Sequence, residues 1–146
     1  MIIIPRVERN IEINAPVKNV YDILDDAKQG IKWNLPVTEM SEVSEGSYAV
    51  KSNLGEFTTT RIESIENKKI SMDIEGGIFS KMGYILNSKG KLTEVTLWGE
   101  FEDVKNEKVL VKAGELLLEG LKNFSEFLEE GGDPDEFDKK QISVAP

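Results

Sequence analysis

Short stretches of alternating apolar and polar residues occupy the first two thirds of the chain, and one long helical stripe follows them. Residues 7–13 alternate with the two-residue period of a β-strand, apart from Arg9. Residues 14–16, Asn-Ala-Pro, form a helix-start signal, because asparagine can cap a helix and proline fits its first turn. Apolar residues recur at helical spacing over 17–27, and residues 31–33 leave room for one more short turn before a proline. The pattern therefore predicts one strand followed by two short helices.

From about residue 38 to residue 102 the pattern is that of strands joined by tight turns. Clusters rich in glycine, asparagine, serine and lysine interrupt it every 8 to 15 residues. Turns this short can only connect antiparallel neighbours, so the region is predicted to be an antiparallel meander. The expected strands span residues 38–44, 47–53, 56–64, 69–75, 79–87 and 92–102.

The two faces of several strands can be assigned from their alternation, as expected for a sheet that is covered on a single side. The residues predicted to face the interior are Ile70, Met72, Ile74, Met82, Tyr84, Leu86, Val95, Leu97, Gly99 and Phe101. Strand 56–64 is ambiguous, and we choose the phase that turns Thr58, Thr60 and Ile62 inward. That phase turns Arg61 outward. A shift of one residue would turn Arg61 inward, where it would be the best candidate to hold a ligand carboxylate or to stabilise an enolate.

The clearest predicted element is a helix over residues 107–130. Its apolar residues fall within about 140° of arc at 100° per residue, and charged residues fill the other side. Only Val111 and Leu118 break this pattern. A helix of this length spans roughly 36 Å, which is enough to cross a whole sheet. Strands followed by one long helix have the element order of an α+β fold.

The composition excludes several kinds of catalytic group and partner. The chain has 146 residues, a single-domain length, and 39% of them are hydrophobic. It contains no cysteine and no histidine, which excludes disulfides and thiolate catalysis and removes the commonest general base and metal ligand. A formal net charge of −9 disfavours nucleic acid and anionic lipid surfaces as partners. Since calcium-loop spacing is also missing, we expect no metal and no cofactor.

The two ends of the chain give weaker signals. No stretch has the length of a signal-peptide core or of a membrane span, so we expect a cytoplasmic protein without stable membrane insertion. Residues 131–146 are acidic and interrupted by glycine and proline, which is typical of a flexible tail following a single domain over residues 1–130. The alternative is a tail that docks a partner through Phe137 and Ile142.

Three stretches resemble the START-like (SRPBCC) superfamily: residues 11–33, with Ile-Glu-Ile-Asn-Ala-Pro at their start and Trp33 at their end, residues 84–95, and the helix at 109–128. The resemblance covers about residues 7–130. It implies a helix-grip fold, in which a curved seven-stranded antiparallel sheet wraps around a long C-terminal helix and two short helices follow the first strand. It also implies a ligand cavity between the sheet and that helix. The superfamily includes lipid-transfer proteins, polyketide cyclase/dehydrase-like proteins and pollen allergens, and no catalytic motif of an enzymatic branch can be matched here.

Several residues are candidates for lining such a cavity, and each has a structural alternative. Inward hydroxyls would orient an otherwise apolar ligand or bond to backbone and trapped water. The methionines would adapt to varied ligands or fill the core. A glycine inside the helical stripe would make room for a ligand or let a strand approach closely, and a tryptophan near the mouth would gate the cavity or belong to the core. The predicted ligand-binding set is Trp33, Tyr48, Thr58, Thr60, Met72, Met82, Tyr84, Leu97, Leu117, Gly120, Leu121 and Phe124.

The second tryptophan is predicted to face outward. Trp98 lies opposite Gly83 across a hairpin, and covering a strand glycine with an aromatic ring is a stabilising device. The alternative is an exposed patch of Trp98 with Phe57 and Ile85 that would support a dimer. We favour the first interpretation, and the sequence leaves monomer and homodimer open.

The preferred function is binding or transport of a small hydrophobic or amphipathic ligand, such as a lipid, an isoprenoid or an aromatic metabolite. An enzyme of the cyclase/dehydrase type is the main alternative, with Tyr48, Tyr84 or Arg61 assisting proton transfer. A third hypothesis is a protein-interaction module like the co-chaperones of the superfamily, which would need a filled core. No residue is assigned a catalytic role.

Overall fold

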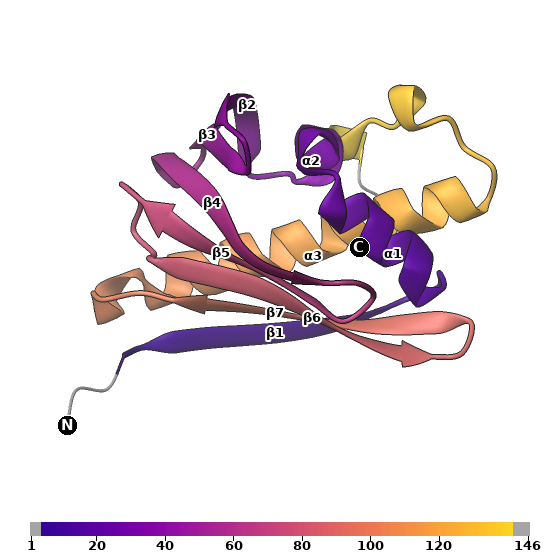
Figure 1. Cartoon of the computed structure of the whole chain (residues 1–146), viewed down its shortest axis with the longest axis horizontal. Helices are drawn as coiled ribbons and strands as arrows, with labels where there is room; N and C mark the ends of the chain where they lie inside the picture. The colour runs from indigo at the N-terminus through magenta and orange to yellow at the C-terminus, as the bar shows by residue number, and fades with distance from the viewer. Residues whose placement is uncertain (1–3, 142–146) are drawn as a thin grey trace.

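In the computed structural model, which describes residues 4–141, an antiparallel sheet curves along one long helix (Figure 1). The strands are β1 (Arg6–Ile13), β2 (Val37–Ser44), β3 (Ser47–Ser52), β4 (Gly55–Ile65), β5 (Lys69–Glu75), β6 (Lys81–Lys89) and β7 (Leu92–Glu100). The helices are α1 (Val17–Asp25), α2 (Gly30–Trp33) and α3 (Glu107–Glu129), with 3₁₀ turns at Ala27–Gln29, Val104–Asn106, Pro134–Glu136 and Lys139–Gln141.

The order of the seven strands within the described residues is β1-β7-β6-β5-β4-β3-β2. Each strand from β2 to β6 therefore pairs with the next one along the chain, and β1 pairs with β7 at the other edge. Local signals explain the hairpins, since Gly46 (φ 78°) and Gly90 (φ 76°) take the left-handed conformation that tight turns need. The predicted α+β helix-grip architecture is confirmed, with every predicted element present.

The outward position predicted for Trp98 is also confirmed. Trp98 is the cross-strand partner of Gly83, and a Cβ atom on Gly83 would lie 2.6 Å from the indole ring. The guanidinium of Arg6 lies 4.6 Å from the centre of the ring on the same face. The alternative, an exposed dimer patch that includes Phe57, is wrong for this residue, because Phe57 packs edge to face on Phe79 on the concave side.

Strand β4 differs from its prediction in its phase, and it also contains a bulge. Arg61 pairs with Met72 and Glu63 pairs with Ser71, which leaves Ile62 as an extra residue. Before the bulge Phe57, Thr59 and Arg61 face the concave side, and Ile62 is 48% exposed on the outer face. The choice of an inward phase for Ile62 was therefore wrong.

The first helix is joined to α3 through a cluster of charged and polar groups at the end of β1. Glu126 accepts hydrogen bonds from the backbone N–H of Asn14 (2.9 Å) and from Lys122 Nζ (2.6 Å). Lys122 also donates to the carbonyl of Glu12 (2.9 Å). Burial acts to raise the pKa of Glu126, but these two hydrogen bonds and the positive charge of Lys122 together outweigh it and leave the pKa below its ordinary value. Ionised Glu126 thus fastens the start of α1 onto α3.

The densest core lies between α1, the C-terminal half of α3 and the adjoining ends of β1 and β7. Its fully buried side chains include Ile13, Val20, Val95, Leu121 and Phe124. Thr93 is also fully buried, and its hydroxyl donates to the carbonyl of Ala15 (2.8 Å). No helix within residues 4–141 has the length and apolar character needed to cross a membrane.

Residues 131–141, which we call the C-terminal strap, pack against the rest of the domain. Phe137 contacts Phe124 and Phe127, with ring centres 5.1 and 5.3 Å apart. Asp135 pairs with Lys32 of α2 (2.9 Å), and Lys139 Nζ donates to two backbone carbonyls before β2 and at its start. The strap therefore has contacts along its length, whereas its flexibility stays a prediction. Ile142, the other proposed docking residue, lies outside the described residues.

Candidate functional site

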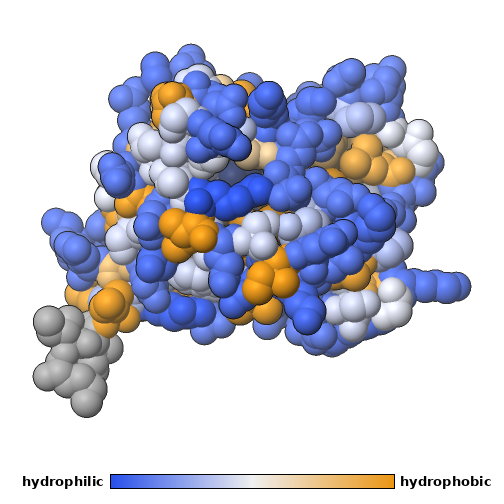
Figure 2. All heavy atoms as spheres, viewed as in Figure 1, coloured by the Kyte–Doolittle hydropathy of each residue, from blue (hydrophilic) through white to orange (hydrophobic). Residues whose placement is uncertain are grey.

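A cavity of about 160 Å³, partly open to solvent, lies between the concave face of the sheet, α3 and the segment from α2 to β2. In the space-filling view the surface is hollowed between the part that carries β2 and β3 and the part that carries α2 (Figure 2). The cavity exists because α3 lies mainly along β1, at one edge of the sheet, so that α3 itself does not cover the strands beyond β7. Small residues Ala113 and Gly114 on the facing side of α3 leave further space.

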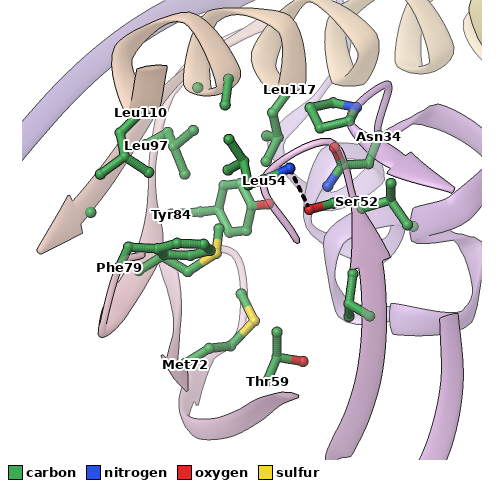
Figure 3. Close-up of a pocket in the computed structure, with 18 of the residues that line it drawn as sticks. Asn34, Ser52, Leu54, Thr59, Met72, Phe79, Tyr84, Leu97, Leu110 and Leu117 are labelled. Carbon is green, nitrogen blue, oxygen red and sulfur yellow. Dashed lines mark hydrogen bonds between the residues drawn. The ribbon is translucent and has the colours of Figure 1, made fainter. Parts of the chain in front are cut away.

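The floor and one end of the cavity are apolar. Met72 and Met82 are cross-strand partners on β5 and β6, and Tyr84 and Leu97 are partners on β6 and β7. Phe79, which precedes β6, completes this end. The side chains of Leu110 and Leu117 reach the cavity from α3 (Figure 3).

The opposite wall is the segment from Trp33 to Val37, and two separate contacts hold it. Helix α3 touches the carbonyl of Trp33 at Gly120, where an added Cβ atom would lie only 2.1 Å from that oxygen. Lys139 of the strap donates to the carbonyls of Asn34 (2.9 Å) and Val37 (2.5 Å). Burial, with a smaller effect of the charge on Lys140, lowers the pKa of Lys139. These contacts fix the position of the wall relative to α3.

One ionisable hydroxyl lies inside the cavity. Tyr84 is 5% exposed, and its hydroxyl makes no hydrogen bond to any residue in the range 4–141. Burial raises its pKa far above the usual range, because the phenolate would lose its hydration there. Tyr84 is therefore a neutral phenol at physiological pH.

Arg61 reaches the rim of the cavity but is already engaged. Its guanidinium donates to Asp25 Oδ1 (2.6 Å) and to the carbonyls of Asp25 (3.0 Å) and Leu24 (3.4 Å). A cation at this position also interacts favourably with the C-terminal end of the α1 dipole. The primary role of Arg61 is thus to hold α1 on β4. On the far side, Arg9 pairs with Glu115 (3.6 Å).

Half of the predicted ligand-binding set is brought together on the cavity wall: Trp33, Met72, Met82, Tyr84, Leu97 and Leu117. Whether they contact a ligand stays a prediction. Tyr48 is on the concave side, as the partner of Thr59, but lies outside the cavity lining and donates to Glu42 (3.3 Å).

The other predicted residues lie elsewhere. Thr58 and Thr60 are on the outer face, because the phase of β4 is the opposite of the predicted one, and Thr60 hydrogen-bonds Ser47 there (2.9 Å). Leu121 and Phe124 are fully buried in the packed core beyond the cavity. One alternative for Gly120 was that it lets a strand approach closely. A close approach is present, but the approaching backbone is that of α2.

Sequence reasoning missed several cavity residues for identifiable reasons. Phe57 and Thr59 were excluded by the wrong phase of β4. Phe79 precedes its strand, where alternation gives no signal, and Leu54 lies in a turn. Leu110 belongs to the apolar stripe of α3, but a stripe does not tell which of its residues face a cavity.

Metal chemistry has no visible site here. No group of three or more acidic residues within residues 4–141 is placed to hold a metal ion. Near the cavity, the Asp25 carboxylate is engaged in an ion pair with Arg61.

Comparison with known proteins supports the fold. No protein-family model matches the chain, and no curated protein matches its sequence. Among solved structures, a START superfamily protein from Mycobacterium smegmatis aligns with a TM-score of 0.75 at 15% identity, over 84% of this chain and 98% of that one. The Zhui aromatase/cyclase from Streptomyces sp. R1128 aligns with a TM-score of 0.74 at 16% identity, over 89% and 99%. The Aha1 dimer from Colwellia psychrerythraea aligns with a TM-score of 0.67 at 15% identity, over 88% and 99%. At these identities the similarity shows that the chain has a START-like fold.

Proposed function

We propose that this chain, with its START-like fold, binds a small and largely apolar molecule in the cavity between the concave face of the sheet and α3. The observation that carries the proposal is an apolar hollow that the protein's own side chains leave unfilled. Enclosed apolar cavities of similar size accept apolar guests such as benzene. The wall residues come from all seven strands and from α1, α2 and α3, so the hollow is a feature of the whole fold.

The volume limits the size of the ligand. About 160 Å³ is close to the roughly 150 Å³ of an apolar cavity that takes up benzene, and it lies below the roughly 300–1,000 Å³ of sites for drug-sized molecules. One ring therefore fits inside, and a longer ligand would extend through the opening. Burying roughly 150 Å² of apolar ring surface at about 25 cal/mol per Å² gives about 4 kcal/mol, or a Kd on the order of 1 mM.

The cyclase/dehydrase alternative has less support from the geometry. The Zhui aromatase/cyclase is a structural neighbour, but a proton-transfer role here would fall to Tyr48, Tyr84 or Arg61. Tyr48 lies outside the cavity lining, and Arg61 is engaged with α1. Tyr84 keeps its proton, which suits a hydrogen-bond donor better than a base.

The protein-interaction alternative has less support as well. It predicts a filled core, and the cavity argues against that. The Aha1 structure is that of a dimer, but nothing in the geometry of the described part of the chain requires a second copy at the cavity.

An NMR titration with single-ring compounds tests the proposal. Toluene and indole, added up to about 5 mM, are expected to shift the methyl resonances of Met72, Met82 and Leu97 and to leave exposed Val43 unchanged. If neither compound shifts the cavity methyls, the proposal is wrong.

A blocking variant sharpens the test. Gly114→Leu points its new side chain into the cavity and is expected to abolish the shifts, since an added Cβ there contacts only Leu97 at 3.4 Å. Lys112→Leu places the same side chain on the exposed face of α3 and should bind as wild type does. Thermal melts of both variants check that they are folded. Equal binding by both variants would place the ligand elsewhere.

A further inference from the structure

Tyr84 places a hydroxyl without a protein partner at the centre of the cavity. The residue sits in the middle of β6, with Ile70 and Leu97 as its cross-strand neighbours. Its side chain is buried, and its hydroxyl bonds to no residue within 4–141. Its oxygen is reached from the cavity rather than enclosed in the core, and buried tyrosines usually have a hydrogen-bond partner. A hydrogen-bonding group on a bound molecule would supply that partner.

The surroundings of Tyr84 are polar on one side and apolar on the other. In the close-up the hydroxyl points toward the side that carries Asn34 and Ser52, whereas Leu110 and Phe79 lie on the opposite side of the ring (Figure 3). The Ser52 hydroxyl is already used, because it accepts from the N–H of Leu54 (3.0 Å) and donates to the carbonyl of Gly55 (3.0 Å). Asn34 Oδ1 is buried without a partner among the described residues. The Tyr84 hydroxyl and Asn34 Oδ1 are therefore the groups left to meet a ligand at the boundary of the two sides.

The charges near the cavity do not favour an anionic ligand. Arg61 would have to release Asp25 and the end of α1 in order to bind a carboxylate, and Arg9 is paired with Glu115. A carboxylate buried without a cation costs several kcal/mol. Because burial also keeps Tyr84 protonated, the site offers neutral groups as its directional contacts: the Tyr84 hydroxyl and the unpartnered Asn34 Oδ1.

We infer, resting on the proposed function, that the cavity prefers a neutral single-ring compound with one hydroxyl or carbonyl oxygen, and that this oxygen hydrogen-bonds the Tyr84 hydroxyl. The ring lies among Phe79, Leu97 and Leu110, and the oxygen points toward the side of Asn34. Ligands with the same ring but no oxygen bind more weakly, and those with a carboxylate bind least.

Three probes with matched rings separate these cases: toluene, p-cresol and benzoate. By NMR titration of the wild-type protein, p-cresol is expected to bind about fivefold to tenfold more tightly than toluene, the size of one neutral hydrogen bond. Benzoate is expected to bind more weakly than toluene. If toluene binds as well as p-cresol, or benzoate binds most tightly, this inference is wrong while the proposed function stands. If none of the three binds, the proposed function itself fails.

A pair of tyrosine variants locates the contact. Tyr84→Phe keeps the ring and removes the hydroxyl, so the ratio of p-cresol to toluene affinity should fall to about one while toluene binds at least as well as before. Tyr48→Phe removes a hydroxyl outside the cavity lining and should keep the wild-type ratio. A wild-type ratio in Tyr84→Phe would overturn the assignment. The probe series on the wild-type chain tests the preference even if a variant is unstable.

Discussion

Gly120 is the position at which α3 touches the backbone of another element, and replacing it tests that contact. A Cβ atom at residue 120 would lie 2.1 Å from the carbonyl oxygen of Trp33 and 3.2 Å from its carbonyl carbon. Real Cβ contacts essentially never fall under 3.0 Å, so α2 and α3 would have to separate by about 1 Å. Because the obstacle is backbone, it cannot rotate away as the end of a side chain can.

Two opposing effects decide the stability of Gly120→Ala. Alanine in a helix interior gains about 1 kcal/mol over glycine. Overpacking typically costs about 1–3 kcal/mol, and a backbone clash this short calls for the upper end of that range or more. The variant is therefore expected to lose about 2 kcal/mol of unfolding free energy, which lowers Tm by roughly 4–8 °C in a domain of this size.

The matched control lies on the same helix. At Gly114 an added Cβ atom meets only Leu97 Cδ2, at the ordinary contact distance of 3.4 Å. Gly114→Ala should therefore show the helix gain alone, up to about 1 kcal/mol of added stability. Urea unfolding followed by circular dichroism measures both variants. If Gly120→Ala is as stable as wild type, or shifts in the same direction as the control, α3 does not contact α2 as described.

Three further changes test other parts of the fold. The fully buried hydroxyl of Ser125 has no partner among residues 4–141, so Ser125→Ala should raise the unfolding free energy by up to about 1 kcal/mol in urea titrations, and a loss would mean that the hydroxyl has a partner. Phe137→Ala should lower Tm by the equivalent of about 1–3 kcal/mol, because its ring packs on two phenylalanines of α3, whereas an unchanged Tm would show a detached strap. Since the pKa of Glu126 is lowered in the folded state, its contribution is present above about pH 4.5 and is lost as the pH falls through the folded-state pKa. Glu126→Gln should therefore reduce the loss of unfolding free energy at acidic pH. The exposed control Glu130→Gln should keep the wild-type pH dependence. Equal pH profiles for the two variants would contradict the Lys122–Glu126 contact.

The elements of the fold could be predicted because their signals are local. Alternation marks a strand from its own residues, and the glycines at 46 and 90 mark hairpins through their own backbone angles. The apolar stripe marks α3 to within one residue of its observed end at Glu129. The order of these elements was then sufficient for the helix-grip architecture.

The cavity could not be predicted to the same degree because its lining depends on how elements meet. Alternation read Ile62 as a core residue, although strand pairing makes it the bulged residue on the outer face. The apolar stripe of α3 treats Leu117 and Leu121 alike, yet one lines the cavity and the other lies in the solid core. The glycine at position 120 indicated a close approach but not which segment approaches, because only the folded chain brings the Trp33 carbonyl to it.

The bulge in β4 explains how α1, which leads to the cavity wall at Trp33–Val37, is held over the sheet. By inserting Ile62, the strand turns both Arg61 and Ser64 to the concave side, where regular alternation would turn only one of them. Arg61 holds the last carbonyls of α1, and the Ser64 hydroxyl hydrogen-bonds that of Tyr21 (2.5 Å). Helix α1 is thereby attached to the sheet at two levels, and the chain that follows it ends against α3 at Gly120. Helix α1 and the segment that follows it are therefore held by β4 and by α3. Because α3 itself stays at the β1 edge, the space between that segment, α3 and the sheet stays open to a ligand.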